Sequence, residues 1–239
     1  MEQASQTRSE KVFISEYVLS NGMVFSGNAR TPIAALVREI FHDEVYAGAF
    51  SGIDSPVVLD LGANVGVFAV WASMPDRGAT VYAVEPVPSS FSLLRTNMLR
   101  LLGASAPYPI QAAVAKSAGN PILYLDRSAS CDTLIAPPSP ELAQRVVGTV
   151  TVEALTLAAV YDRFSLPSCD ILKIDVEGSE CGVLNAASDD ELRKARRVIV
   201  ETHDYLVPGG RALVRARLAS AGFDVCQGAT GELLMAVRK

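Results

Sequence analysis

The chain has 239 residues, of which 49% are hydrophobic and 20% charged, so it can bury a large core and wholesale disorder is excluded. A net charge of −5 argues against a nucleic-acid partner, because binding to a phosphate backbone needs a basic surface. The N-terminus lacks the apolar core of a secretory signal, and no apolar run reaches the roughly 18 residues of a membrane span. The four cysteines form no CxxC pair, so we expect no disulfide framework, no structural zinc and a reduced, cytoplasmic protein.

The N-terminal part is expected to form a hairpin and a helix. Residues 11–30 hold short apolar runs broken by Asn-Gly and Ser-Gly-Asn, a pattern typical of two short strands. A helix is expected to follow, with Thr31 as its N-cap and Pro32 at its first helical position. Apolar residues then recur at helical spacing from Ile33 to Phe41.

After Pro56 the chain alternates short β-branched runs with helical patterns. The expected core strands cover residues 57–62, 80–86, 108–116, 169–178 and 196–204, with helices at 64–74 and 89–102, extra strands at 122–125 and 151–157, and a closing hairpin at 223–227 and 233–238. This alternation predicts a mostly parallel sheet covered on both faces. Ligands of such sheets bind beyond the carboxyl ends of the strands. Residues 135–144 are proline-rich and predict a loop, either a mobile lid or a tolerated insertion.

LDLGANVG, residues 59–66, is the first candidate ligand-binding stretch. Gly62 follows a strand and Gly66 opens a helix, where glycine permits a sharp turn and exposed amides favour an anionic group. Glu85 ends the next strand about 19 residues further on, near the ~20-residue spacing at which an acid meets ribose hydroxyls. The alternative is that Glu85 only caps a helix and that the two glycines only ease packing.

Asn64 bears on which nucleotide is bound. It stands where a dinucleotide-binding turn has the glycine that lets a pyrophosphate approach. This favours a ligand without phosphate, S-adenosylmethionine (AdoMet), with its amino-acid end near the turn and its ribose on Glu85. An NAD-dependent dehydrogenase and a catalytically silent AdoMet-binding protein are the alternatives.

Several further stretches extend this pattern over much of the chain. They are VREIFHDEVYAG (37–48), VEP (84–86), VEALTL (152–157), LKIDVEGSE (172–180) and VIVETH (198–203). With LDLGANVG, they follow one another in the order and spacing of the FkbM-type methyltransferases, which this sequence resembles. LKIDVEGSE is the most specific element. Ala158, where an acid is common, and Asn185, where glycine is common, depart from the family pattern, but both lie away from the proposed centre.

The resemblance implies a Rossmann-like class I methyltransferase: an α/β fold with a mostly parallel, seven-stranded sheet whose last strand is antiparallel. Residues 1–55 would cover the mouth of the cofactor and acceptor site, and residues 56–239 would form the AdoMet-binding domain. AdoMet would be the methyl donor and S-adenosylhomocysteine the product, with a hydroxyl of a sugar, polyketide or peptide natural product as acceptor. The implied cofactor-binding residues are Asp60, Gly62, Ala63, Asn64, Gly66, Glu85, Pro86, Ala113 and Asp175.

Candidate catalytic residues follow two neighbouring core strands. An alcohol becomes a good nucleophile when a base removes its proton. His203 is the general-base candidate, because its unperturbed pKa suits proton transfer near neutrality. Asp175 would orient the acceptor or the sulfonium end of AdoMet, and Glu177 and Glu201 complete the set. The structural alternatives are a loop carbonyl as the partner of His203, backbone amides at Gly178-Ser179 as partners of Glu177, and an arginine as the partner of Glu201.

Three other residues have expected places near this site. Lys173 is expected to pair with a carboxylate and to hold the strand end in register. Tyr46 would contact AdoMet or the acceptor, or simply pack, and Trp71 belongs to the core. Carboxylates from neighbouring strand ends offer oxygen ligands for Mg²⁺. The sequence shows no separate ligand motif, so we assign no metal site.

Overall fold

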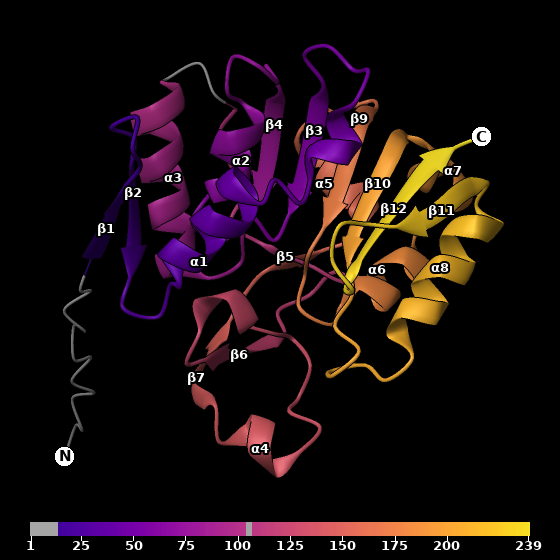
Figure 1. Cartoon of the computed structure of the whole chain (residues 1–239). Coiled ribbons are helices and arrows are strands. Elements are labelled where there is room, and N and C mark those ends of the chain that lie inside the picture. Colours follow the sequence, from indigo (N-terminus) through magenta and orange to yellow (C-terminus); the bar gives the residue numbers. More distant parts are fainter. Residues whose placement is uncertain (1–13, 104–106) are drawn as a thin grey trace.

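The computed structural model describes residues 14–103 and 107–239 (Figure 1). The first three residues of the predicted hairpin, 11–13, lie outside these ranges. The strands are β1 (Ile14–Val18), β2 (Val24–Asn28), β3 (Val57–Leu61), β4 (Thr80–Val84), β5 (Ala113–Val114), β6 (Ile122–Asp126), β7 (Val146–Thr151), β8 (Ala154–Leu155), β9 (Cys169–Ile174), β10 (Ala195–Glu201), β11 (Phe223–Gln227) and β12 (Leu233–Arg238).

The helices are mostly short and lie between the strands. They are α1 (Ile33–Val37), the π-helical turn η1 (Arg38–His42), the 3-10 turns η2 (Ala47–Phe50) and η3 (Ala129–Cys131), α2 (Val67–Ala72), α3 (Pro88–Leu102), α4 (Pro140–Ala143), α5 (Leu157–Arg163), α6 (Glu180–Ala186), α7 (Asp189–Arg193) and α8 (Gly210–Ser220). None of the helices in the described ranges has the length and apolar character needed to cross a membrane.

The central sheet has the strand order β11-β12-β10-β9-β3-β4. β4, β3, β9 and β10 are parallel, whereas β12, the last strand, runs antiparallel to both of its neighbours. The seventh position, beside β4, is reduced to Ile110, which forms a parallel bridge with Val84. The strand predicted at 108–116 is therefore wrong as a single element, since Ala113 and Val114 form β5, which pairs with β8 and not with β4. The Rossmann-like fold with an antiparallel last strand is thus confirmed.

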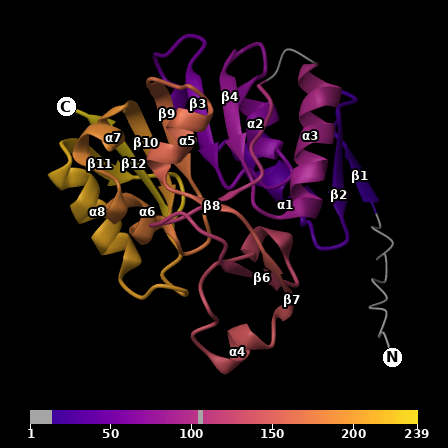
Figure 2. The ribbon, with the colours of Figure 1, turned by 180° about the vertical axis from the view of Figure 1, so that it is seen from behind.

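Alternating side chains of β9 serve the two faces of the sheet, as a buried parallel strand requires. Ile171 packs into the apolar layer formed with α1, α2 and α3. Leu172 and Ile174 pack into the opposite layer, with α5, α6, α7 and α8. Figures 1 and 2 show α1, α2 and α3 beside the β3–β4 end of the sheet and α8 beside the β11–β12 end.

The segment between β5 and β8 forms a lobe of its own. β6 and β7 pair in antiparallel fashion and, with α4, lie away from the central sheet, at the bottom of Figure 1. The strand predicted at 122–125 is therefore confirmed as part of β6. The strand predicted at 151–157 is confirmed only at Ala154–Leu155, which form β8: Thr151 ends β7, and Thr156 caps α5 by accepting a hydrogen bond from Ala159 N at 3.2 Å.

The N-terminal prediction is confirmed for the hairpin, since β1 and β2 pair in antiparallel fashion. The capping prediction is wrong: Pro32 occupies the N-cap of α1, without a side-chain cap. Thr31 Oγ1 instead accepts a hydrogen bond from Asn28 N at 3.2 Å and closes the preceding turn. The helical pattern that continues to Phe41 becomes the π-helical turn η1.

Candidate active site

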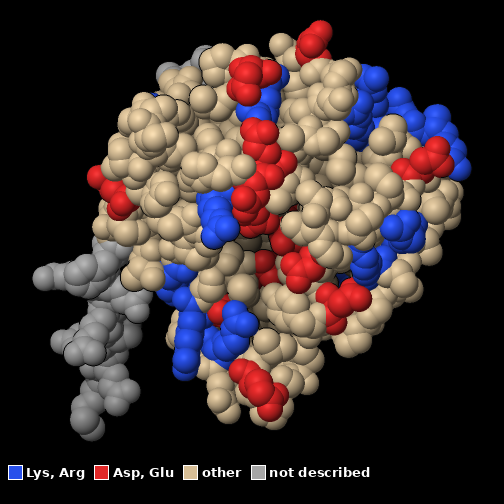
Figure 3. All heavy atoms as spheres, viewed as in Figure 1, with Lys and Arg blue, Asp and Glu red and all other residues tan. Residues whose placement is uncertain are grey.

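A cavity of about 420 Å³ opens at the carboxyl ends of β3, β4, β9 and β10, which is a typical size for a small-molecule site. Residues of α1 and η1 line one side, and residues of the β6–β7 lobe line another. Figure 3 shows acidic side chains gathered around a hollow in this face of the molecule. The charged lining residues are Glu39, Glu85, Asp132, Asp175, Glu177, Glu201 and Glu232, with Lys173 and Arg145 as the cations. The cavity therefore carries a surplus of carboxylates.

The turn after β3 packs tightly against its neighbours. Gly62 and Gly66 have φ of 84° and 86°, a conformation that favours glycine. A Cβ on Gly62 would lie 1.7 Å from the Asp175 carbonyl oxygen, and one on Gly66 would lie 2.7 Å from Leu94 Cδ1. Gly62, Ala63 and Asn64 line the cavity, whereas Gly66 lies behind its wall. Gly66 therefore fits the alternative in which the glycine only eases packing. Gly62 packs closely and also lines the cavity.

Glu85, which follows β4, joins two loops at the cavity wall. Its Oε2 accepts a hydrogen bond from Asn64 N, and its Oε1 accepts one from Val87 N, both at 2.9 Å. Val87 is the N-cap residue of α3, so Glu85 does bind a helix end, as the structural alternative predicted, but it also binds the glycine turn. Burial raises the pKa of Glu85 to about 8. Pro86 and Ala113, the other predicted cofactor contacts on this side, also line the cavity.

Asp60 lies below the cavity and not in its lining. Its fully buried carboxylate is 3.3 Å from Lys173 Nζ, which also lies 3.1 Å from Asp175 Oδ2. Burial alone would lower the pKa of Lys173, but the carboxylates of Asp175 and Asp60 raise it well above its usual range. The predicted pairing of Lys173 with a carboxylate is confirmed. Asp60 is therefore connected to the site through Lys173, whose ammonium group contacts both Asp60 and Asp175.

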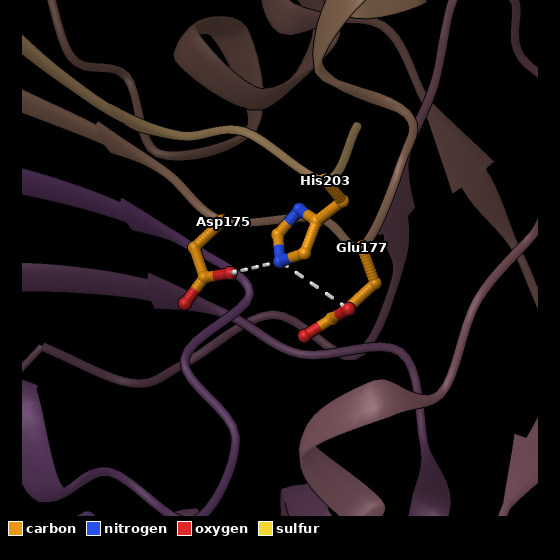
Figure 4. A group of neighbouring side chains, drawn as sticks. All are labelled: Asp175, Glu177 and His203. Carbon is orange, nitrogen blue, oxygen red and sulfur yellow. Dashed lines mark ion pairs between the residues drawn. The ribbon is translucent and has the colours of Figure 1, made fainter. Parts of the chain in front are cut away.

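Asp175, Glu177 and His203 converge in the turns that follow β9 and β10 (Figure 4). His203 Nε2 lies 3.8 Å from Asp175 Oδ1 and 3.3 Å from Glu177 Oε2. The other ring nitrogen, Nδ1, lies 2.9 Å from Glu180 Oε1. β9 ends at Ile174, so Asp175 and Glu177 belong to the turn and not to the predicted strand at 169–178.

The charges in this group shift one another's proton affinities. Burial alone would lower the pKa of His203, but the hydrogen bond to Glu180 and the charges of Glu177, Glu180 and Asp175 raise it to about 10. Burial also raises the pKa of Glu177 well above its usual range, although the charge of His203 opposes this. Glu177 has φ of 48°, an uncommon conformation for such a residue that functional sites often hold.

The contacts overturn two structural alternatives for these residues. The partners of His203 are carboxylates and not a loop carbonyl. Glu177 accepts a hydrogen bond from Tyr205 Oη at 3.0 Å, while the nearby amides bond to Glu180. The sequence analysis did not single out Glu180, although it is the last residue of the LKIDVEGSE motif.

Glu201 faces the same cavity from the end of β10. Its Oε2 accepts a hydrogen bond from Tyr46 Oη at 3.2 Å, so tyrosine and not arginine is its partner. The charge of Asp175, with burial, raises the pKa of Glu201 to about 8. Tyr46 lines the cavity, and Trp71 is buried in the core as predicted, with the Arg77 guanidinium 3.9 Å from its ring centroid.

Asp175, Glu177 and His203 also form a set that could hold a divalent cation. Each offers one ligand atom, and these atoms lie within 4.8 Å of one another. Two carboxylates and an imidazole suit several divalent metals. With its pKa raised to about 10, however, His203 is protonated near neutral pH, and a metal ligand must be deprotonated. A cation would therefore compete with the imidazole proton for these carboxylates.

A Rossmann-like sheet with an antiparallel last strand and a cavity at its carboxyl ends is the architecture of the class I methyltransferases. The crystal structure of Methyltransferase FkbM from Methylobacillus flagellatus KT shares this fold, with a TM-score of 0.53 at 14% identity, covering 77% of this chain and 44% of that chain.

The sequence matches the Methyltransferase FkbM domain over residues 60–225. It is 32% identical to the 31-O-demethyl-FK506 methyltransferase FkbM of Streptomyces tacrolimicus, covering 80% of this chain and 81% of that protein. It is 28% identical to Methyltransferase sdnD of Sordaria araneosa, covering 80% and 82% respectively. The chain belongs to the FkbM methyltransferase family, and it is a methyltransferase. This membership favours methyl transfer over the dehydrogenase alternative.

Proposed function

We propose that the protein transfers the methyl group of AdoMet to a hydroxyl of a small metabolite and releases S-adenosylhomocysteine. The observation that carries this proposal is that the glycine turn with Glu85 and the group of Asp175, Glu177 and His203 face one cavity. A cofactor held by the first would have its reactive end near the second. The relative named for 31-O-demethyl-FK506 supports oxygen as the acceptor atom and a natural product as the substrate class.

The charge and the lining of the cavity support AdoMet as its ligand. Gly62, Ala63 and Asn64 would contact its amino-acid end, and Glu85, with Pro86 and Ala113 nearby, would receive the ribose hydroxyls. Bound AdoMet supplies an electrophilic methyl group on a sulfonium. The carboxylates around the cavity offset that positive charge, and Asp175 lies at the end of β9 where they converge. Asp60 and Gly66 would support this site from behind.

His203 would accept the proton of the acceptor hydroxyl. During transfer of the methyl group that bound AdoMet would supply, the acceptor hydroxyl would give its proton to Nε2, the nitrogen that faces Asp175 and Glu177. The two carboxylates stabilise the imidazolium that results. They also hold the proton on His203 in the free protein, so the base works better as the pH rises.

The N-terminal segment would cover the acceptor side of the cavity. Within the described part of that segment, Ala35, Leu36 and Ile40 contribute apolar lining, and Glu39 adds a carboxylate. A hydroxylated acceptor with an apolar portion fits such a wall. Because the mouth is acidic, neutral or cationic acceptors should bind better than anionic ones.

Calorimetric titration with S-adenosylhomocysteine and with NAD tests the cofactor, and transfer of an isotope-labelled methyl group from AdoMet tests the reaction. We expect S-adenosylhomocysteine to bind and a panel of sugar, polyketide and peptide hydroxyls to include an acceptor. Binding of NAD alone would overturn the proposal. Cofactor binding without methyl transfer to any hydroxyl in the panel would favour the catalytically silent alternative.

A further inference from the structure

We propose that Glu180 is the positioning residue of this site: by accepting a hydrogen bond from His203 Nδ1, it sets the tautomer of the imidazole and turns Nε2 toward the acceptor. The catalytic importance of that orientation rests on the proposed function. The Glu180–His203 interaction itself stands on geometry and can be tested without cofactor or acceptor.

Glu180 is placed to join the two turns that carry the site. It is the first residue of α6 and is buried, with 3% of its surface exposed. Its Oε1 accepts hydrogen bonds from Val176 N at 3.2 Å and Gly178 N at 3.0 Å, and it lies 2.9 Å from His203 Nδ1. A single carboxylate oxygen thus ties the turn after β9, which bears Asp175 and Glu177, to the loop after β10, which bears His203.

The hydrogen-bond chemistry of this contact fixes the tautomer. An ionised carboxylate only accepts hydrogen bonds, so Nδ1 must carry the hydrogen in the contact between Glu180 and His203. The lone pair of the neutral imidazole then lies on Nε2. The tautomer of a histidine is commonly set by the partner of its other nitrogen, and a carboxylate is a frequent partner.

Nε2 faces two carboxylates without a tight bond to either. Its distances of 3.8 Å to Asp175 Oδ1 and 3.3 Å to Glu177 Oε2 exceed the roughly 2.7–2.9 Å of a charge-assisted hydrogen bond. The 2.9 Å contact of Nδ1 with Glu180 is within that range. The ring is therefore anchored at Nδ1, and its Nε2 edge is left facing the cavity.

Glu180 has the role that a buried carboxylate has beside a catalytic histidine in other enzymes: it holds the ring in one orientation and stabilises the imidazolium. The charged and titratable groups that face His203 are Asp175 and Glu177 in the turn after β9, Glu180 on α6, Glu201 at the end of β10 and Tyr205 in its own loop. Lys173 offsets part of the charge of Asp175. Among residues 14–103 and 107–239, Glu180 alone lies within hydrogen-bond distance of Nδ1, so it differs from the others in its effect on the tautomer.

The test is nuclear magnetic resonance of the full chain with isotope-labelled histidine. The protein has two histidines, and His42, exposed on η1, provides an internal reference. We expect neutral His203 in the wild type to be protonated at Nδ1 and to titrate well above the usual range of a histidine. In Glu180→Gln, the His203 midpoint should fall by about one pH unit or more, because an adjacent negative charge is removed. Both tautomers should appear, since a glutamine side chain can accept or donate.

Glu177→Gln is the matched control, since it removes a similar charge near Nε2. It should lower the His203 midpoint but keep the Nδ1-protonated tautomer. His42→Gln assigns the two signals. A wild-type His203 protonated at Nε2 in its neutral form would overturn the proposal, and so would an unchanged His203 titration in folded Glu180→Gln. The wild-type tautomer decides the question even where Glu180→Gln fails to fold.

Titration of the same samples with S-adenosylhomocysteine separates this inference from the proposed function. If the wild-type protein fails to bind S-adenosylhomocysteine, the proposed function is wrong, while the His203 tautomer still reports on Glu180. If the wild type binds it and His203 shows the wrong tautomer, the positioning role alone is refuted.

Discussion

Lys173 and Asp60 face each other across the β3–β9 register, with Nζ 3.3 Å from Oδ1, and both side chains are buried. Lys173 also reaches Asp175 Oδ2, so one cation connects a fully buried carboxylate with one at the cavity. Its ammonium lies 5.3 Å from the Phe68 ring centroid. A charge held in such an apolar layer is tolerated only while its partners are present.

The first prediction concerns this pair. Lys173→Met should lower the free energy of unfolding by about 3–5 kcal/mol, because it leaves Asp60 buried without a countercharge. The double variant Asp60→Asn with Lys173→Met should be less destabilised than Lys173→Met alone, since the unpaired charge is gone. Urea unfolding of the wild type, Lys173→Met, Asp60→Asn and the double variant measures both effects. If the double variant instead shows the sum of the single losses, the pair is not coupled.

The second prediction separates chemistry from cofactor binding at His203. His203→Gln should reduce methyl transfer by about 10²–10⁴-fold, the usual contribution of a general base, while binding of S-adenosylhomocysteine stays near the wild-type value. Labelled methyl transfer and calorimetry give the two readings. His42→Gln, on the exposed turn η1, is the matched control and should alter neither. Wild-type turnover in His203→Gln would remove His203 from the mechanism.

The third prediction is a pH dependence whose sign follows from the carboxylates around His203. The pKa of His203 is raised to about 10, so the base is mostly protonated near neutrality. The value of kcat/KM, which reports the free enzyme, should rise about tenfold per pH unit as the pH approaches that value. Glu180→Gln should move the rise to lower pH. A flat profile between pH 7 and pH 9 would contradict a base of this kind.

The same shift also makes protein stability depend on pH. Because the folded pKa of His203 lies above the usual 6.5, its stabilising contribution is complete below pH 6.5 and is lost as the pH rises through about 10. His203→Gln should therefore flatten this part of the unfolding curve. Denaturant unfolding at several pH values measures the difference between the two proteins.

The fourth prediction concerns Glu85 and the cofactor. Above pH 8, where Glu85 is mostly ionised, Glu85→Gln should weaken S-adenosylhomocysteine binding by about tenfold or more, because hydrogen bonds from ribose hydroxyls to a charged group are stronger than those to an amide. Glu153→Gln removes a carboxylate from an exposed position and should leave the dissociation constant unchanged. Equal affinity of wild type and Glu85→Gln would show that the ribose does not contact this residue.

The sequence predicted the parts of this site that depend on periodic pattern and on motifs. Short apolar runs that alternate with helical patterns predicted β3, β4, β9 and β10, and the rule that ligands bind at strand ends pointed to Glu85 and His203. The sequence did not reveal which side-chain atoms of the site are in contact. The contact of Glu180 with His203 depends on how the turn after β9 folds back onto α6, and that turn contains Glu177 in a left-handed conformation.

The sequence also did not predict the hydrogen bonds at the ends of several strands and helices. The seventh strand is reduced to a bridge at Ile110, and Thr31 bonds to the preceding turn where a helix cap was expected. At Thr31, the local hydrogen bond from Asn28 N outweighs the preference of threonine for a helix cap. Asp60 is a different case. A carboxylate in a nucleotide-binding motif suggests ligand contact, but here Asp60 forms an ion pair with Lys173 on the adjacent strand.

The last prediction concerns metal dependence, because the geometry of Asp175, Glu177 and His203 would allow them to bind a cation. Their ligand atoms are close enough to share one cation, but a protonated His203 already places a positive charge between the carboxylates. We therefore expect a chelator such as EDTA to leave methyl transfer unchanged at pH 7.5, and added Mg²⁺ to give no increase. Loss of activity with EDTA and its recovery with Mg²⁺ would mean that the cation displaces the imidazole proton. His203 would then be a metal ligand, and the acceptor hydroxyl would lose its proton through the metal instead of through Nε2.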